Sequence, residues 1–205
     1  GGLVGLQSVY ELKPKEIMNL FLGKKLIVKC IRANRMLSWI TNKFQLKKTI
    51  FIIRHPCATI ASQLKTGWCG YHTKTKPFSD IIPDKKTVLN EASKIDMIHP
   101  NLLNKLKKIE TKEEILATVW CLDNLIPLSS KKPYPWKTVV YEKLVKEGRE
   151  EIVKILNEIG EKNNQEQILK YLKVPSGLAQ KDDLKIVLKV NKQLSKWKEK
   201  LSEKQ

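Results

Sequence analysis

The chain has 205 residues, 41% of them hydrophobic, so it is long enough to bury one continuous core. Its 39 Lys and Arg residues outnumber its 21 Asp and Glu residues, which gives a formal net charge of +18 and a surface that attracts polyanions. The alternative explanation for part of this scattered lysine excess is a biased genomic base composition. No apolar run approaches the roughly 20 residues that a membrane span needs.

The cysteines and histidines do not form a metal-binding pattern. Cys30, Cys57, Cys69 and Cys121 lie far apart, and the chain has only three histidines. We therefore expect no metal site. Because small disulfide-bonded scaffolds are shorter and richer in cysteine, we expect reduced, mostly buried thiols and a cytoplasmic protein.

Three short runs rich in β-branched residues predict strands, and each run is apolar on both faces. They span residues 26–30, 49–53 and 138–141. Such runs, separated by helical patterns, are typical of a parallel sheet that is covered on both faces. The sequence therefore predicts an α/β fold, with a helix over residues 36–44 as the crossover between the first two strands. Asn34 or Ser38 is available to cap a turn.

A helix and then a long loop are expected after the second strand. Pro56 suits the first position of a helix, which the pattern extends to about Lys65. Residues 71–90 have little periodicity and are predicted to form a loop. The glycine-rich residues 1–5 are expected to be a tail or linker.

Two further helices have clear ends. The helical pattern over residues 109–125 includes a capping box of Thr111 and Glu114. An apolar stripe over residues 152–159 stops at Gly160, a residue that favours a helix C-terminus.

The end of the second strand carries an anion-binding combination of residues. In an open parallel sheet, ligands bind beyond the carboxyl ends of the strands, where helix N-termini present free N–H groups. Arg54, the helix that starts near Pro56, and the hydroxyl of Ser62 together suit a phosphomonoester. The alternative is structural: Arg54 pairs with a carboxylate, and Ser62 caps a turn or faces solvent.

The string from Thr49 to Ser62 resembles the 3′-phosphate motif of sulfotransferases. In that motif a strand ends in Arg-x-Pro, and a serine follows eight residues after the arginine, as in Arg54-His55-Pro56 and Ser62. The family's arginine and serine bind the 3′-phosphate of 3′-phosphoadenosine 5′-phosphosulfate (PAPS). The resemblance implies cofactor-binding roles for Arg54 and Ser62, with PAPS as the sulfuryl donor and no metal.

Other segments extend the resemblance, in the family's order, over about residues 24–205. Residues 28–34 are similar to a strand end that often reads Lys-Thr-His, and residues 120–124 are similar to a helix of bacterial and archaeal members. Residues 140–145 are similar to the family's Tyr-Glu-Asp-Leu segment, and residues 196–202 are similar to its Trp-Lys-x-x-Leu-Ser segment.

These segments imply roles for further residues. Lys29 matches a lysine that neutralises charge on the transferring sulfuryl group, and Arg32 is a second candidate catalytic cation. Tyr141 is expected near the adenine as a cofactor-binding residue, the alternative being packing at a strand end. Trp197 is either core or part of the nucleotide site through Lys196 or Lys198.

Two features depart from the family. The 5′-phosphosulfate loop has no counterpart before residue 26, so we expect the chain to lack the first strand and that loop and to begin inside a longer protein. Ile31 stands where many members carry a histidine base, and it cannot accept a proton. Residues 67–72, with their glycines and aromatic rings, are a candidate part of an acceptor pocket.

The resemblance thus implies a three-layer αβα fold with a parallel sheet, of the P-loop-like sulfotransferase type. We expect a single domain over residues 1–205, with a tail or helix over 1–23 and the family-like region over 24–205. The expected function is sulfuryl transfer from PAPS to a hydroxyl or amine acceptor, without a nucleic-acid partner. The alternative is a basic protein that binds nucleic acid or another polyanion. A P-loop kinase is disfavoured because no GxxxxGK[ST] string occurs.

Overall fold

The computed structural model describes residues 4–5, 26–30, 33–46, 48–66, 82–160, 166, 168–169 and 194–201. The chain divides into two compact units, Gly1–Asn34 and Arg35–Gln205. The single domain expected over residues 1–205 stays a prediction.

The first unit contains a small parallel sheet. Strand β1 (Val4–Gly5) pairs with strand β2 (Leu26–Ile27), with Val4 opposite Leu26. The interpretation of residues 1–5 as a tail is therefore wrong for Val4 and Gly5, because the apolar run at Leu26 gives them a strand partner.

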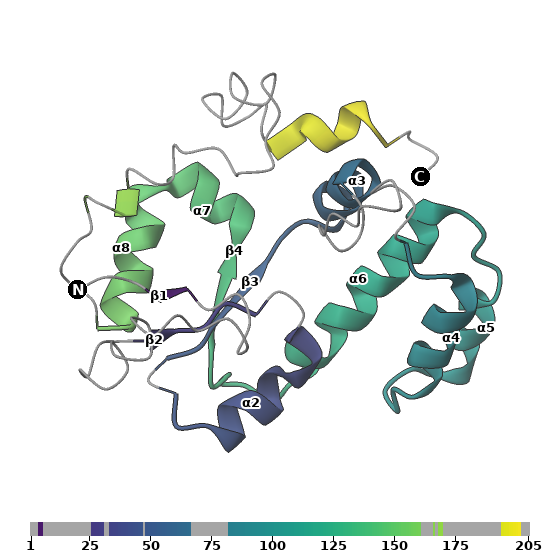
Figure 1. The fold of residues 1–205 in the computed structure, drawn as a ribbon, viewed down its shortest axis with the longest axis horizontal. Helices are drawn as coiled ribbons and strands as arrows, with labels where there is room; N and C mark the ends of the chain where they lie inside the picture. The colour runs from purple at the N-terminus through teal and green to yellow at the C-terminus, as the bar shows by residue number, and fades with distance from the viewer. Residues whose placement is uncertain are drawn as a thin grey trace. The chain divides into compact units, whose positions relative to one another are not determined.

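The second unit combines one parallel strand pair with helices (Figure 1). Its strands are β3 (Ile50–Ile53) and β4 (Lys137–Val140). Its α-helices are α2 (Leu37–Lys43), α3 (Pro56–Thr66), α4 (Lys85–Ser93), α5 (Pro100–Leu106), α6 (Lys112–Ser129), α7 (Tyr141–Glu147) and α8 (Arg149–Glu158). The structure also describes two 3₁₀ turns, η2 (Asn34–Met36), which begins at the last residue of the first unit, and η4 (Lys196–Glu199).

The α/β class is confirmed, but the expected sheet is not formed as predicted. β3 pairs in parallel with β4, and β2 pairs in parallel with β1 in the other unit, so the predicted crossover between β2 and β3 stays a prediction. β3 is also not covered on both faces: Phe51 is 3% exposed, whereas Ile50 and Ile52 are 39% and 58% exposed. The three-layer P-loop-like arrangement remains a prediction.

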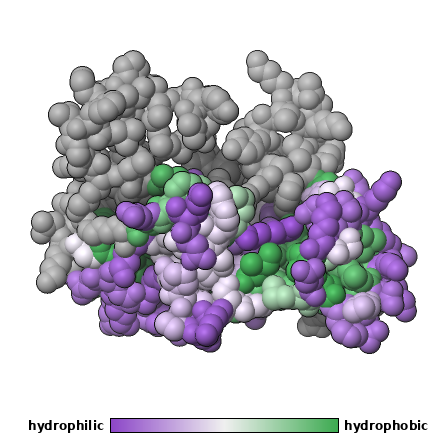
Figure 2. Space-filling view, turned by 90° about the horizontal axis from the view of Figure 1, so that it is seen from below, coloured by the Kyte–Doolittle hydropathy of each residue, from purple (hydrophilic) through white to green (hydrophobic). Residues whose placement is uncertain are grey.

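Two apolar clusters stabilise the second unit. One joins α4, the turn after it and α6 through Val88, Ala92, Ile98, Val119 and Leu122. The other packs α2 against the sheet through Leu37, Phe51 and Trp136. Seen from below, hydrophobic residues also gather in patches on an otherwise hydrophilic surface (Figure 2).

The structure tests the predicted helix starts. The capping box at Thr111 and Glu114 is present at the start of α6, and the helix after Pro56 is confirmed. Met36 is the N-cap of α2, and no side chain supplies a capping hydrogen bond there, whereas Asn34 begins the 3₁₀ turn that precedes the helix.

The loop predicted over residues 71–90 is wrong at its end, where α4 begins. The Asp84 side chain accepts the N–H of Thr87 as the helix N-cap, and this starts α4 at Lys85. Val88 and Ala92, four residues apart, then bury one face of the helix. Residues 67–81 lie outside the described part of the chain.

The thiols are less buried than predicted. Cys30 and Cys121 are exposed and Cys57 is partly buried, all of them free, while Cys69 lies outside the described residues. Cys121 is exposed because the core-facing positions of α6 are taken by neighbours such as Val119 and Leu122.

Leu116 tests the packing of α6. Its side chain is 0% exposed, so Leu116→Ala should lower the free energy of unfolding by about 2–5 kcal/mol through lost burial and a cavity. Chemical denaturation measures this change. Leu128→Ala, at a site 43% exposed on the same helix, is the matched control and should cost far less. Equal losses in both variants would contradict the assigned core.

The capping box should make stability depend on pH. Glu114 accepts the N–H groups of Glu110 and Thr111, and these hydrogen bonds hold its pKa below the ordinary value of 4.5. Because the folded pKa is depressed, this stabilisation is complete above the unfolded pKa and is lost as the pH falls through the folded pKa. Glu114→Gln should therefore reduce the acid-induced loss of stability in denaturation measured from pH 6 to pH 2. Glu113→Gln, which leaves the box intact, should retain it.

Candidate anion-binding site

The register of the second sheet brings two chain segments to one edge. Ile53 lies opposite Val140 at the ends of the parallel strands, so the following residues, Arg54 and Tyr141, leave the sheet side by side. Figure 1 shows β3 leading towards α3 and β4 running into α7. The guanidinium carbon of Arg54 lies 5.0 Å from the centroid of the Tyr141 ring, which is cation–π distance. Strand β4 ends at Val140, and Tyr141 begins α7. The prediction that the strand extends to Tyr141 is therefore wrong.

Arg54 differs from the other arginines that the structure describes. Arg35 pairs with Asp123 at 2.8 Å and with Glu91 at 3.1 Å, and Arg149 pairs with Glu166. No carboxylate among the described residues forms an ion pair with Arg54. Its Nε atom is buried without a hydrogen-bond partner. A buried, unsatisfied donor on a charged group is costly, which favours an anionic ligand at this position.

The start of α3 adds further donors to the same edge. Pro56 at the first helical position has no N–H, and the next N–H groups, of Cys57 and Ala58, have no acceptor within the helix. The positive end of the helix dipole lies there too. Ser62 is exposed and lies about 9 Å further along the helix axis, given a rise of about 1.5 Å per residue.

The peptide group between Arg54 and His55 is held by two other elements. The indole N–H of Trp120, on α6, donates to the carbonyl oxygen of Arg54 at 3.2 Å. The N–H of His55 donates to the carboxylate of Glu142, on α7, at 2.9 Å. Both polar atoms of one peptide group are therefore satisfied by side chains, beyond the point where the strand ladder ends.

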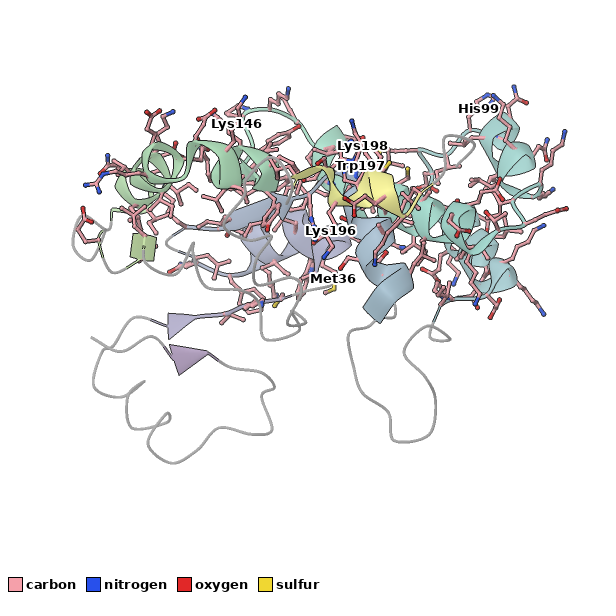
Figure 3. The ribbon with its side chains drawn as sticks, turned by 90° about the horizontal axis from the view of Figure 1, so that it is seen from above. Met36, His99, Lys146, Lys196, Trp197 and Lys198 are labelled. Atoms are coloured by element: carbon pink, nitrogen blue, oxygen red, sulfur yellow. The ribbon has the colours of Figure 1, made fainter. Side chains whose placement is uncertain are left out.

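The C-terminal turn η4 packs against α3. Figure 3 shows Lys196, Trp197 and Lys198 together on this turn. The Trp197 ring stacks on His55, with centroids 5.0 Å apart and planes 16° apart, and the Lys198 ammonium lies 5.7 Å from the Trp197 centroid. Trp197 is partly buried rather than part of the core, and the His55 side chain stacks on its ring.

The two candidate catalytic cations belong to the other unit. Lys29 is exposed and follows β2, and Arg32 lies outside the described residues. The candidate acceptor segment, residues 67–72, is also outside them. Arg54, Tyr141, Trp197 and Ser62 all belong to the second unit.

Sequence reasoning missed the partners of the Arg54–His55 peptide. The sequence alone assigns no role to Glu142 or Trp120. The available signal was the position of Glu142, two residues after a strand that runs parallel to the one that ends just before Arg54. Nothing in the sequence pairs Trp120 with Arg54, since their contact spans 66 positions.

Other kinds of site are not evident in the described part of the chain. It contains no group of three or more His, Cys, Asp or Glu residues that could hold a metal. No helix within it has both the length and the apolar character to cross a bilayer. A hollow of about 300 Å³, lined by Leu89, Pro100 and Lys107 among others, lies on α4 and α5 and includes none of the candidate site residues.

Comparison with protein-family models, with curated proteins and with solved structures gave no match to this chain. The resemblance to sulfotransferases therefore rests on the sequence motifs alone.

The stack of Trp197 on His55 is a testable contact. Trp197→Ala removes it and should loosen η4 at the start of α3, because the aromatic face that stacks on His55 is lost. The backbone N–H groups of Lys200 and Leu201, which bond to the Trp197 carbonyl, should then exchange faster in hydrogen-exchange mass spectrometry. Lys198→Ala, which leaves the stack intact, is the control. Unchanged exchange in Trp197→Ala would show that the stack does not hold the turn.

Proposed function

We propose that the chain binds the 3′-phosphate of PAPS at Arg54 and is part of a sulfotransferase that transfers a sulfuryl group to a hydroxyl or amine acceptor. The observation that carries this proposal is the state of Arg54. Its guanidinium has a buried Nε without a partner and no carboxylate counter-ion among the described residues. It also stands at the carboxyl end of two parallel strands, where such folds bind anions.

The surrounding residues suit a phosphate on a nucleoside. A guanidinium binds phosphate through paired, charge-assisted hydrogen bonds, and the first turn of α3 adds backbone donors. Tyr141 offers an aromatic face beside the guanidinium. Lys196 and Trp197 approach the same helix from η4. Ser62 fits less directly, because it lies further along α3. It would contact the phosphate only if the phosphate lies beside the helix rather than at its N-terminus.

The transfer chemistry needs positive charge elsewhere. When bound, PAPS supplies an activated sulfuryl group whose oxygens carry the developing charge. By the family resemblance, Lys29 and Arg32 would neutralise that charge. The acceptor's proton also needs a base, and Ile31 cannot supply one.

Calorimetric titration with adenosine 3′,5′-bisphosphate tests the proposal. Arg54→Ala should weaken binding at least about 30-fold, since truncating one partner of a desolvated charge pair costs about 2–5 kcal/mol. Arg54→Lys keeps the charge but loses the paired hydrogen bonds, so its affinity should lie between those of the wild type and Arg54→Ala. Arg149→Ala removes an equal charge from an exposed position and should bind like the wild type.

The ligand controls separate this proposal from simple charge attraction. Adenosine 5′-phosphate, which lacks the 3′-phosphate, should bind more weakly and should not respond to Arg54→Ala. If a short DNA binds as tightly as the bisphosphate, with a steep salt dependence, the net charge of +18 is the cause and the alternative polyanion function is favoured. No binding of the bisphosphate by the wild-type chain would contradict the proposed site.

A further inference from the structure

We infer that Trp120 and Glu142 are positioning residues that orient Arg54 for phosphate binding by holding the Arg54–His55 peptide group between them. This inference rests on the proposed phosphate site and names residues that would control its affinity without contacting the ligand.

The two side chains match the two ends of the peptide group. An indole N–H can only donate, and an ionised carboxylate can only accept. Trp120 donates to the Arg54 carbonyl oxygen at 3.2 Å, and Glu142 accepts from the His55 N–H at 2.9 Å. Because one carbonyl and one N–H define a peptide plane, the two contacts together fix the orientation of that plane.

This peptide needs such partners because of its place in the fold. The strand ladder ends at Ile53 opposite Val140, so the next peptide group has no neighbouring strand to pair with. Backbone polar groups beyond the end of a ladder bond to water or to side chains, and here both bond to side chains. α6 packs against α3 and α7 follows β4, so both helices can deliver a side chain to this position.

Fixing the peptide plane also fixes the direction of the Arg54 side chain. The plane sets ψ of Arg54 and φ of His55, and Pro56 restricts the conformation of His55 from the other side. Little backbone freedom then remains between the strand and α3. The Cα–Cβ bond of Arg54 is consequently held in one direction, and the guanidinium lies over Tyr141, the residue that precedes Glu142 on α7. A group fixed before the ligand arrives loses less entropy on binding.

Glu142 also acts without neutralising the arginine. Its carboxylate binds the backbone, and no ion pair between Glu142 and Arg54 forms in the described structure. The positive charge of Arg54 thus stays available for an anion, although a carboxylate lies one residue away from its aromatic partner.

Three substitutions test the role. Trp120→Phe keeps a ring but removes the donor, and Glu142→Ala removes the acceptor. Each should raise the Kd for adenosine 3′,5′-bisphosphate by about two- to tenfold, the equivalent of one net hydrogen bond. Glu142→Gln keeps an acceptor oxygen and should bind at least as well as the wild type, because it also removes a negative charge near the phosphate.

The readouts distinguish positioning from general destabilisation. Affinity for adenosine 5′-phosphate should not change in any of the three variants, and hydrogen exchange at the His55 N–H should accelerate in Glu142→Ala only. Wild-type affinity in both Trp120→Phe and Glu142→Ala would overturn the inference, as would equal losses for the two nucleotides. If the wild type binds the bisphosphate and Arg54→Ala abolishes binding, the proposed function stands whatever these variants show. If the wild type does not bind it, both proposals fail.

Discussion

The parallel pairing of β3 with β4 is the constraint on which the candidate site depends. Because Ile53 and Val140 end the two strands in register, the residues that follow them emerge at one edge. Arg54 meets Tyr141 there, and α3 and α7 begin there. A slip of one residue in this register would turn alternate side chains to the other face and separate the guanidinium from its aromatic partner.

The charge distribution gives this edge its chemical character. Most cations in the described chain either face solvent or pair with carboxylates, as Arg35 does with Asp123 and Glu91. Arg54 is partly buried and keeps its charge uncompensated by a carboxylate of the described structure. A net charge of +18 alone attracts anions in general, whereas the proposed site would use one oriented guanidinium between two helix N-termini to favour a compact anionic group.

Local patterns in the sequence predicted local structure well. The capping box at Thr111 and the proline at the start of α3 were recognisable because each depends on neighbours within a few residues. The sheet was less predictable, since an apolar run does not reveal its partner, and β2 pairs with β1 rather than β3. The exposure of Ile52 shows the same limit: its composition indicates a buried strand, but burial depends on which elements cover that face. In the site, Arg54 and Tyr141 could be predicted because they lie at the ends of recognisable strands. The indole that binds the Arg54 carbonyl could not, because it comes from a helix distant in the sequence.

The contacts of the Arg54–His55 peptide group also determine when the site can form during synthesis of the chain. Its two contacts close loops of 66 and 87 residues, so neither can form until α6 and then α7 have left the ribosome. Closing such loops costs entropy before the contacts compensate for it. A nascent chain that has folded only as far as α3 would contain Arg54, but without the two side chains that fix its backbone. Competence to bind would then be acquired late in synthesis, after most of the second unit has assembled.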